Sequence, residues 1–198
     1  MAAYSLHKEE LEMSNVYESV PKFENERWLL RFVEKTDADD LLEVYGDKNA
    51  LPFFNSDNCD GDIFYYPTKK LMNKAIDFWL YSYKEKYFVR WAIVDKVTGK
   101  AIGTIESFKR ISGDSFNESG ILRLDVGSKY EKAEILKDIM SLIVPHIFKM
   151  FECKQVVTKV PVYAVERTAA AKAFGFEETE AFLLAKDGTP FNGYWIFD

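Results

Sequence analysis

The sequence is poor in cysteine and histidine, with two of each among 198 residues. Cys59 and Cys153 lie far apart and form no CxxC pair, and with His7 and His146 they make no zinc-ligand spacing. Two isolated cysteines are typical of free thiols in a reducing compartment. We therefore expect two free thiols, with a single disulfide as the alternative, and no metal cofactor.

A surplus of positive charge is also missing. The chain carries 26 Lys and Arg against 32 Asp and Glu, a formal net charge of −6, whereas proteins that grip phosphate backbones are usually basic. No apolar run approaches the length of a membrane-spanning helix. The first residues, MAAYSLHKEELEM, lack the basic start and apolar core of a secretory signal. We expect a cytoplasmic protein with no nucleic-acid and no membrane partner.

The composition is that of an ordinary globular chain, with 47% hydrophobic and 29% charged residues. A chain of this length can bury one full core. Residues 1–26 are polar and carry no clear periodicity, so we expect an N-terminal arm that packs weakly. Residues 27–198 then form one domain.

Apolar periodicity within that domain alternates between helix and strand spacing. Helices are predicted to begin near Thr36 and Thr68 and to cover about 131–151 and 164–174. Strands are predicted at 27–35, 88–95, 100–108, 121–126 and 154–162, followed by a closing hairpin around Asp187-Gly188. The fold class is α/β (α+β), with a mixed sheet and helices on both faces.

The long connection 46–67 contains the stretch DNCDGD, which suggests a calcium loop. Aligning Gly61 with the sixth position of such a loop puts Ser56 first and Pro67 last, where carboxylates are required. The calcium hypothesis therefore fails. Loops of this length inside compact domains are usually functional or mobile.

The stretch 121–134, ILRLDVGSKYEKAE, reads as a strand, a turn and the start of a helix. That geometry presents unpaired backbone N–H groups and the positive end of a helix to an anion. However, its one glycine, Gly127, lies at the end of the strand and not at the start of the helix.

Three stretches match a known pattern: FENERWLLRFVEKTDADDL (23–41), KAIGTIESF (100–108) and ERTAAAKAFGFEETEAF (166–182). On these stretches the chain resembles the GNAT superfamily of acetyl-CoA-dependent N-acetyltransferases, from about residue 23 to the C-terminus. The branch it looks most like acetylates the N-termini of ribosomal proteins and related amines. The resemblance implies a GNAT-like, mostly antiparallel central sheet, with acetyl-CoA as co-substrate.

The resemblance also assigns the cofactor site. In the family, the strand before the phosphate turn offers backbone N–H groups, and the turn carries an Arg or Gln followed by two glycines. Here Glu131 and Glu134 bring negative charge to that turn. The residues that the resemblance places at the cofactor are Leu124, Val126, Lys129, Lys132, Ala133 and Arg167. For Arg167 the alternative is a pair with Glu166 or another surface acid.

Acetyl transfer to an amine needs a base, donors for the thioester oxygen and an acid for the thiolate. Glu106 and Asp125 are the candidate bases, and the alternative is that they lie on the solvent side of their strands, with Asp125 paired to Arg123. Tyr163 is the candidate acid, and the alternative is a half-buried aromatic with a wet hydroxyl.

The loop 50–66, rich in Phe, Tyr and Asp, is the expected site for an amine acceptor, because its acidic residues suit a cation. The alternative is that its aromatic side chains only cover the sheet edge. The function that the sequence favours is that of an N-acetyltransferase acting on a small-molecule or peptide amine. The alternative is a GNAT-fold protein that has lost acetyl-CoA and works as a binding module. The aromatic segment 191–197 is a candidate for pairing in a homodimer.

Overall fold

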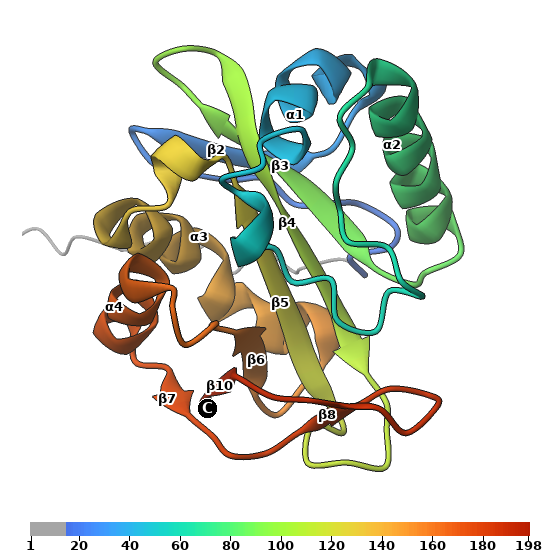
Figure 1. Ribbon diagram of the computed structural model, residues 1–198, viewed down its shortest axis with the longest axis vertical. Helices are drawn as coiled ribbons and strands as arrows, with labels where there is room; N and C mark the ends of the chain where they lie inside the picture. The colour runs from blue at the N-terminus through green and yellow to red at the C-terminus, as the bar shows by residue number, and fades with distance from the viewer. Residues whose placement is uncertain (1–14) are drawn as a thin grey trace, which may run out of the picture.

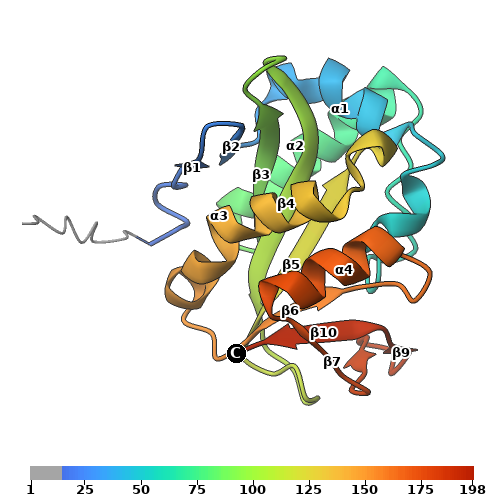
Figure 2. The same cartoon turned by 90° about the vertical axis from the view of Figure 1, so that its left-hand side faces the viewer.

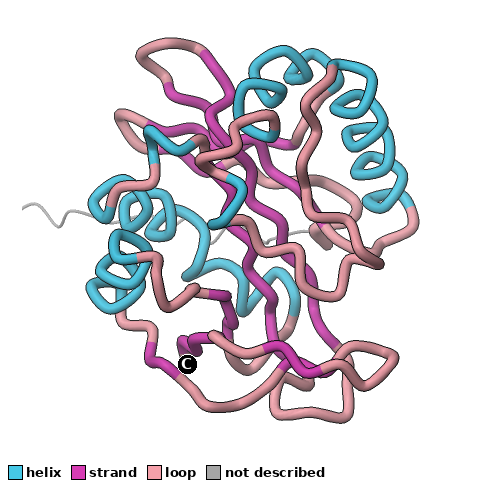
Figure 3. Tube along the Cα trace, in the orientation of Figure 1, coloured by secondary structure: helices cyan, strands magenta, loops and turns pink. Residues whose placement is uncertain are grey.

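The computed structural model describes residues 15–198. A central sheet runs through the molecule, with helices on both of its faces (Figures 1, 2 and 3). The helices are α1 (Ala38–Tyr45), α2 (Lys69–Lys84), α3 (Ala133–Phe151) and α4 (Val165–Phe174), with short 3-10 turns η1 (Lys35–Asp37), η2 (Leu51–Phe53) and η3 (Ser128–Tyr130).

The eight strands of the main sheet are ordered β1-β2-β3-β4-β5-β6-β10-β7. They are β1 (Phe23–Glu24), β2 (Trp28–Phe32), β3 (Val89–Asp95), β4 (Lys100–Arg110), β5 (Ser119–Val126), β6 (Val156–Lys159), β10 (Tyr194–Phe197) and β7 (Glu177–Glu178). Only β5 and β6 pair in parallel within this sheet. The prediction of a mixed, mostly antiparallel sheet with helices on both faces is confirmed.

The ends of the elements follow from local chemistry. Thr68 caps α2, because its side chain accepts a hydrogen bond from the Leu71 amide. Gly175 ends α4 with φ of 113°, a conformation that costs glycine little. The predicted closing hairpin is also present, with β8 (Leu183–Leu184) and β9 (Pro190–Phe191) on either side of a turn at Gly188.

Each face of the sheet has its own apolar core. Alternate residues of β2 to β5 pack against α3 and α4 on one face, and α1 and α2 cover the other (Figure 2). Within β5, Leu122, Leu124 and Val126 face α3, as the alternation of the strand predicts. Arg123 and Asp125 therefore face the side of α1 and α2.

Gly103 explains one sequence motif, the Ile-Gly-Thr-Ile of β4. A Cβ atom at this position would lie 2.1 Å from the Asp125 carbonyl oxygen and 2.8 Å from the Val126 Cα. The backbone of β5 therefore approaches β4 as closely as only glycine permits. This contact fixes the end of β5 that leads into the turn at Gly127.

The expectation that the N-terminal segment packs weakly is wrong for residues 15–26, whereas residues 1–14 lie outside the described part of the chain. Val16 is buried, β1 pairs with β2, and the Trp91 indole donates a hydrogen bond to the Pro21 carbonyl. A short polar segment can pack in this way because a few buried contacts are enough to hold it. So few contacts leave no apolar periodicity in the sequence. The strands β1 and β7, each of two residues, were not predicted for the same reason.

Candidate functional site

A wedge opens between β5 and β6, because their pairing ends at Leu122 and Thr158 while β5 continues to Val126. The Gly120 amide bonds the Gln155 carbonyl, and the Thr158 hydroxyl donates to the Leu122 carbonyl at 2.9 Å. Alternate residues of β5 thus direct their backbone polar groups toward β6. By this alternation the Leu124 carbonyl points into the wedge.

Arg167 of α4 fills the wedge with its guanidinium group. Its Nη1 donates to the Leu124 carbonyl at 2.7 Å, while Nε and Nη2 donate to the two carboxylate oxygens of Glu131 at 2.7 and 2.8 Å. Arg167 is 3% exposed and Glu131 6%. Burial alone lowers the pKa of Arg167, but its bonds to the Glu131 carboxylate raise the pKa above its ordinary value, so the guanidinium group stays charged.

The turn between β5 and α3 uses its backbone donors within the chain. The Ser128 amide bonds an Asp47 carboxylate oxygen at 3.1 Å, and the Ala133 amide, at the start of α3, bonds a Glu166 carboxylate oxygen at 2.8 Å. Lys132 lies 3.6 Å from the other oxygen of Glu166. A carboxylate of α4 thus occupies the helix end that would favour an external anion.

These residues do not fit the pyrophosphate and pantetheine of acetyl-CoA. Three carboxylates, those of Asp47, Glu131 and Glu166, surround the turn and would repel a phosphate. Arg167 is in the predicted region, and its partner is a buried acid, Glu131, and not Glu166 or an acid on the surface. Lys129 is exposed, with its ammonium group 5.0 Å from the centre of the Tyr130 ring.

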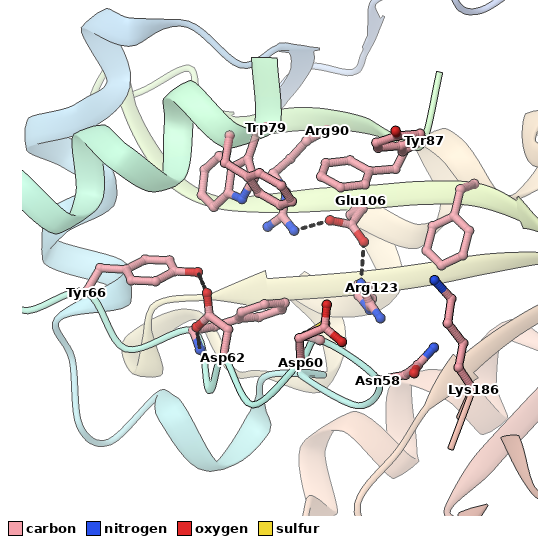
Figure 4. Close-up of a pocket in the computed structure, with 15 residues that line it drawn as sticks. Asn58, Asp60, Asp62, Tyr66, Trp79, Tyr87, Arg90, Glu106, Arg123 and Lys186 are labelled. Carbon is pink, nitrogen blue, oxygen red and sulfur yellow. Dashed lines mark hydrogen bonds and ion pairs between the residues drawn. The ribbon is translucent and has the colours of Figure 1, made fainter. Parts of the chain in front are cut away.

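A second polar group lies across three strands on the other face of the sheet. Arg90 of β3, Glu106 of β4 and Arg123 of β5 stand opposite one another in register. Both arginines bond the Glu106 carboxylate, Arg123 at 2.5 Å (Figure 4). All three are buried, with exposed fractions of 2%, 1% and 8% in that order.

Glu106 is therefore a poor candidate for a general base. Burial raises the pKa of its carboxyl, but the charges of Arg90 and Arg123 outweigh burial and hold the pKa below its ordinary value. The alternative of a solvent-facing carboxylate is also wrong for this residue. The alternative of an ion pair between Arg123 and Asp125 is also wrong, since Arg123 bonds Glu106 instead.

Asp125 is buried next to this group and bonds Tyr45 of α1. The Tyr45 hydroxyl donates to an Asp125 oxygen at 3.1 Å and lies 2.7 Å from the Thr104 hydroxyl. The other Asp125 oxygen has no partner among the described residues. Burial, partly offset by Arg90, raises the pKa of this carboxyl. Asp125 has the raised pKa of a base, but it lies inside the core and not on the solvent side of its strand.

The third predicted catalytic residue, Tyr163, lies on the surface. It is 60% exposed, and its hydroxyl donates to the Pro52 carbonyl at 2.5 Å. Its ring is 6.2 Å from that of Phe53 in η2. Tyr163 thus joins the loop before α4 to the long loop after α1.

A pocket of about 360 Å³ opens above the Arg90–Glu106–Arg123 group (Figure 4), within the range of about 300–1,000 Å³ that is typical of small-molecule sites. Its walls are mainly aromatic, and its rim comes from the loop after α1 and from the closing hairpin. The aromatic residues are Phe64, Tyr66, Phe78, Trp79, Tyr87, Phe88 and Phe108, and the rim residues are Asn58, Cys59, Asp60, Asp62 and Lys186.

The rim of this pocket is held in strained backbone. Asn58, Asp60 and Phe64 have φ values of 57°, 52° and 60°, which are rare for residues other than glycine and exceptional for a bulky one. Asp57 anchors the loop, because its carboxylate accepts from Lys159 at 2.5 Å and from the Tyr194 hydroxyl at 3.0 Å. The prediction that this loop forms a binding site remains a prediction, and its placement over a pocket is consistent with it.

Sequence reasoning missed Arg90 and Asp57. Arg90 stands in the strand FVRWAIVD, where an arginine between apolar residues is an available signal of a buried, paired charge. Asp57 gave no signal of its own, because its partners come from residues 102 and 137 positions further along the chain.

Across residues 15–198 there is no group of three or more His, Cys, Asp or Glu that could hold a metal ion. In the same residues, no helix combines the length and the apolar character needed to cross a membrane. Cys59 and Cys153 are both free thiols.

No family model and no curated protein matches the sequence. Solved structures do match in fold. The ribosomal-protein-S5-alanine acetyltransferase of Vibrio fischeri has a TM-score of 0.64 at 16% identity, covering 89% of this chain and 94% of that one. A GNAT-family acetyltransferase of Bacillus anthracis has a TM-score of 0.66 at 12% identity, covering 89% and 98%.

A GCN5-related N-acetyltransferase of Brucella melitensis has a TM-score of 0.65 at 15% identity, covering 89% of this chain and 78% of that one. The chain therefore has the GNAT fold, on which known acetyltransferases are built. Identities this low show the fold and leave the activity to be argued from the site.

Proposed function

We propose that this chain is a GNAT-fold protein that does not use acetyl-CoA and acts as a binding module. One observation carries the proposal: the Arg167 guanidinium stands in the wedge between β5 and β6, bonded to the Leu124 carbonyl and to both oxygens of Glu131. Pantetheine would have to displace a buried ion pair to reach the backbone of β5. Breaking such a pair from one side costs about 3–5 kcal/mol.

The phosphate turn argues in the same direction. The Ala133 and Ser128 amides already donate to carboxylates of Glu166 and Asp47. A bound pyrophosphate would lose these donors and would also face the two displaced carboxylates. Lys129 and Lys132 are exposed, and surface charges of this kind contribute about 0–1 kcal/mol each.

The test compares the wild-type chain with a variant whose wedge is opened. Glu131→Gly, Glu166→Ser and Arg167→Ser together remove the internal ligands and two of the three carboxylates. Acetyl-CoA binding is then measured by equilibrium dialysis, with Lys35→Ser, Asp77→Ser and Glu43→Ser as a matched surface control. We expect no binding to the wild type or the control at millimolar acetyl-CoA. Saturable binding of millimolar acetyl-CoA to the wild type would contradict the proposal.

The second candidate function is acetyl transfer from acetyl-CoA to a primary amine. It is favoured by the wedge itself, by the α3 N-terminus that follows β5 in the chain, and by the similarity in fold to solved acetyltransferases. On this hypothesis the pair of Arg167 and Glu131 opens when the cofactor enters. The dialysis experiment separates the two functions, because only the second requires wild-type binding.

A further inference from the structure

We infer that the pocket above the Arg90–Glu106–Arg123 group binds a small carboxylate with a flat apolar body, of the kind of an aromatic acid. The inference deepens the proposed binding function by naming its ligand class. It rests on three features of the pocket: the charge of its floor, the nature of its walls and the state of its rim.

The floor of the pocket carries two guanidinium groups. They share one carboxylate, since Arg90 and Arg123 each bond a different oxygen of Glu106. The second carboxylate, Asp125, lies 3.9 Å from Nη1 of Arg90, so Arg123 is left with a share of Glu106. A buried charge without a full counter-ion is costly. A carboxylate entering the pocket would give Arg123 a counter-ion that it does not share.

The two arginines also keep donors that the protein does not use. Arg90 uses Nη1 for the Tyr45 and Thr104 hydroxyls and Nη2 for Glu106, while Arg123 uses Nη2 for the Asp57 carbonyl. The Nε atom of each arginine is buried and has no partner among the described residues, so a ligand would reach it only after the side chain shifts. A guanidinium has five donors in a planar fork that matches the two oxygens of a carboxylate.

Aromatic rings lie against the guanidinium groups and form the apolar walls of the pocket. The Arg90 guanidinium lies 4.1 Å from the centre of the Trp79 ring, and that of Arg123 lies 5.5 Å from the centre of Phe108. These rings already have a cation on the face that would attract a cationic ligand. The aromatic part of the pocket therefore suits an uncharged flat group better than an ammonium.

The acidic residues of the rim do not reverse this preference. Asp62 is already engaged, since its two oxygens accept from the Phe64 amide at 2.7 Å and the Tyr66 hydroxyl at 2.8 Å. Asp60 is exposed to solvent, where screening weakens its charge. Lys186, from the closing hairpin, adds a positive charge at the same rim (Figure 4).

The experiment uses ligands that differ in one group. N-acetylphenylalanine carries a carboxylate, its primary amide is neutral, and phenethylamine carries an ammonium. Each is titrated into the full chain, with binding followed by quenching of tryptophan fluorescence and by calorimetry. We expect the acid to bind at least about tenfold more tightly than its amide, as a charge-assisted contact predicts. Equal binding of acid and amide, or tighter binding of phenethylamine, would overturn the inference.

Two variants locate the contact. Arg123→Met should abolish the preference for the acid, while Lys35→Met, at an exposed residue that does not line the pocket, should leave it within about threefold. Arg123→Lys covers the case in which Arg123→Met does not fold. It keeps the charge but lacks the fork, so we expect weaker binding of the acid with the preference retained. An unchanged affinity in Arg123→Lys and Arg123→Met would show that the floor does not hold the ligand.

The pocket and the proposed function can fail separately. Wild-type binding of acetyl-CoA would remove the proposed function but leave the carboxylate site in place. Failure of the acid to bind, together with no binding of acetyl-CoA, would overturn the ligand class alone.

Discussion

The ion pair of Arg167 and Glu131 gives the strongest prediction for stability. Both side chains are almost fully buried, with exposed fractions of 3% and 5%, and three hydrogen bonds join Arg167 to Glu131 and the Leu124 carbonyl. Arg167→Met leaves a buried carboxylate unpaired, and Glu131→Met leaves a buried guanidinium unpaired. Each change should lower the free energy of unfolding by about 3–5 kcal/mol.

The double variant should be milder than either single one. With both charges gone, the main loss is the donor to the Leu124 carbonyl, which costs about 1–3 kcal/mol for a buried unsatisfied group. Two single changes would sum to about 6–10 kcal/mol, so the coupling energy is at least about 3 kcal/mol. Urea denaturation followed by tryptophan fluorescence measures all four proteins.

The matched control is the surface pair Lys35 and Asp77, 2.7 Å apart, with side chains 73% and 57% exposed. The same cycle there should give under about 1 kcal/mol. A coupling energy between Arg167 and Glu131 as small as that of the control would refute the reasoning, because it would mean that the wedge is open to water in solution.

Four further predictions follow from single residues. Burial raises the pKa of the Asp125 carboxyl in the folded state. This carboxyl therefore destabilises the fold increasingly as the pH rises above its unfolded pKa. Urea titrations should show that Asp125→Asn gains stability relative to wild type between about pH 4 and pH 7. For Asp114, burial raises the pKa, but hydrogen bonds from the Leu184 amide, Ser112 and Arg110 outweigh burial and lower the pKa to about 2. Asp114→Asn should therefore lower the free energy of unfolding by about 2 kcal/mol at pH 7. This difference from wild type should disappear as the pH falls from about 4 to 2. Burial raises the pKa of the Cys59 thiol to about 11. Alkylation of this thiol by iodoacetamide at pH 8 should therefore be about a hundredfold slower than that of a cysteine in a peptide. Equal rates would contradict the burial of Cys59. Gly103→Ala should prevent soluble expression or lower the melting temperature by more than about 10 °C, because its Cβ atom would lie 2.1 Å from the Asp125 carbonyl oxygen.

Much of the fold could be predicted from periodicity. The apolar stripes of α2 and α3 and the alternation in β5 are local properties of the sequence, and each element formed where its pattern indicated. Turn residues fixed the ends, as at Gly175 and Gly188. Two-residue strands such as β1 and β7 carry no periodicity, so their pairing depends on the tertiary structure.

The candidate site could be predicted only in part, because its contacts join distant segments. Glu131 was expected to weaken phosphate binding, but the sequence does not say that its carboxylate meets Arg167, 36 positions later. The same holds for Glu106, whose two arginines come from neighbouring strands. Residue types indicated charge, and only the register of the sheet decided whether that charge faces solvent, substrate or a partner.

The central claim is that the chain's own side chains fill the acetyl-CoA site. The most direct measurement is the melting curve of the wild-type protein with and without millimolar acetyl-CoA. A ligand at a hundredfold excess over its Kd adds about 2.7 kcal/mol to the free energy of unfolding. We predict no saturable shift of the melting temperature. A saturable rise with acetyl-CoA, absent with the same concentration of ATP, would contradict the account.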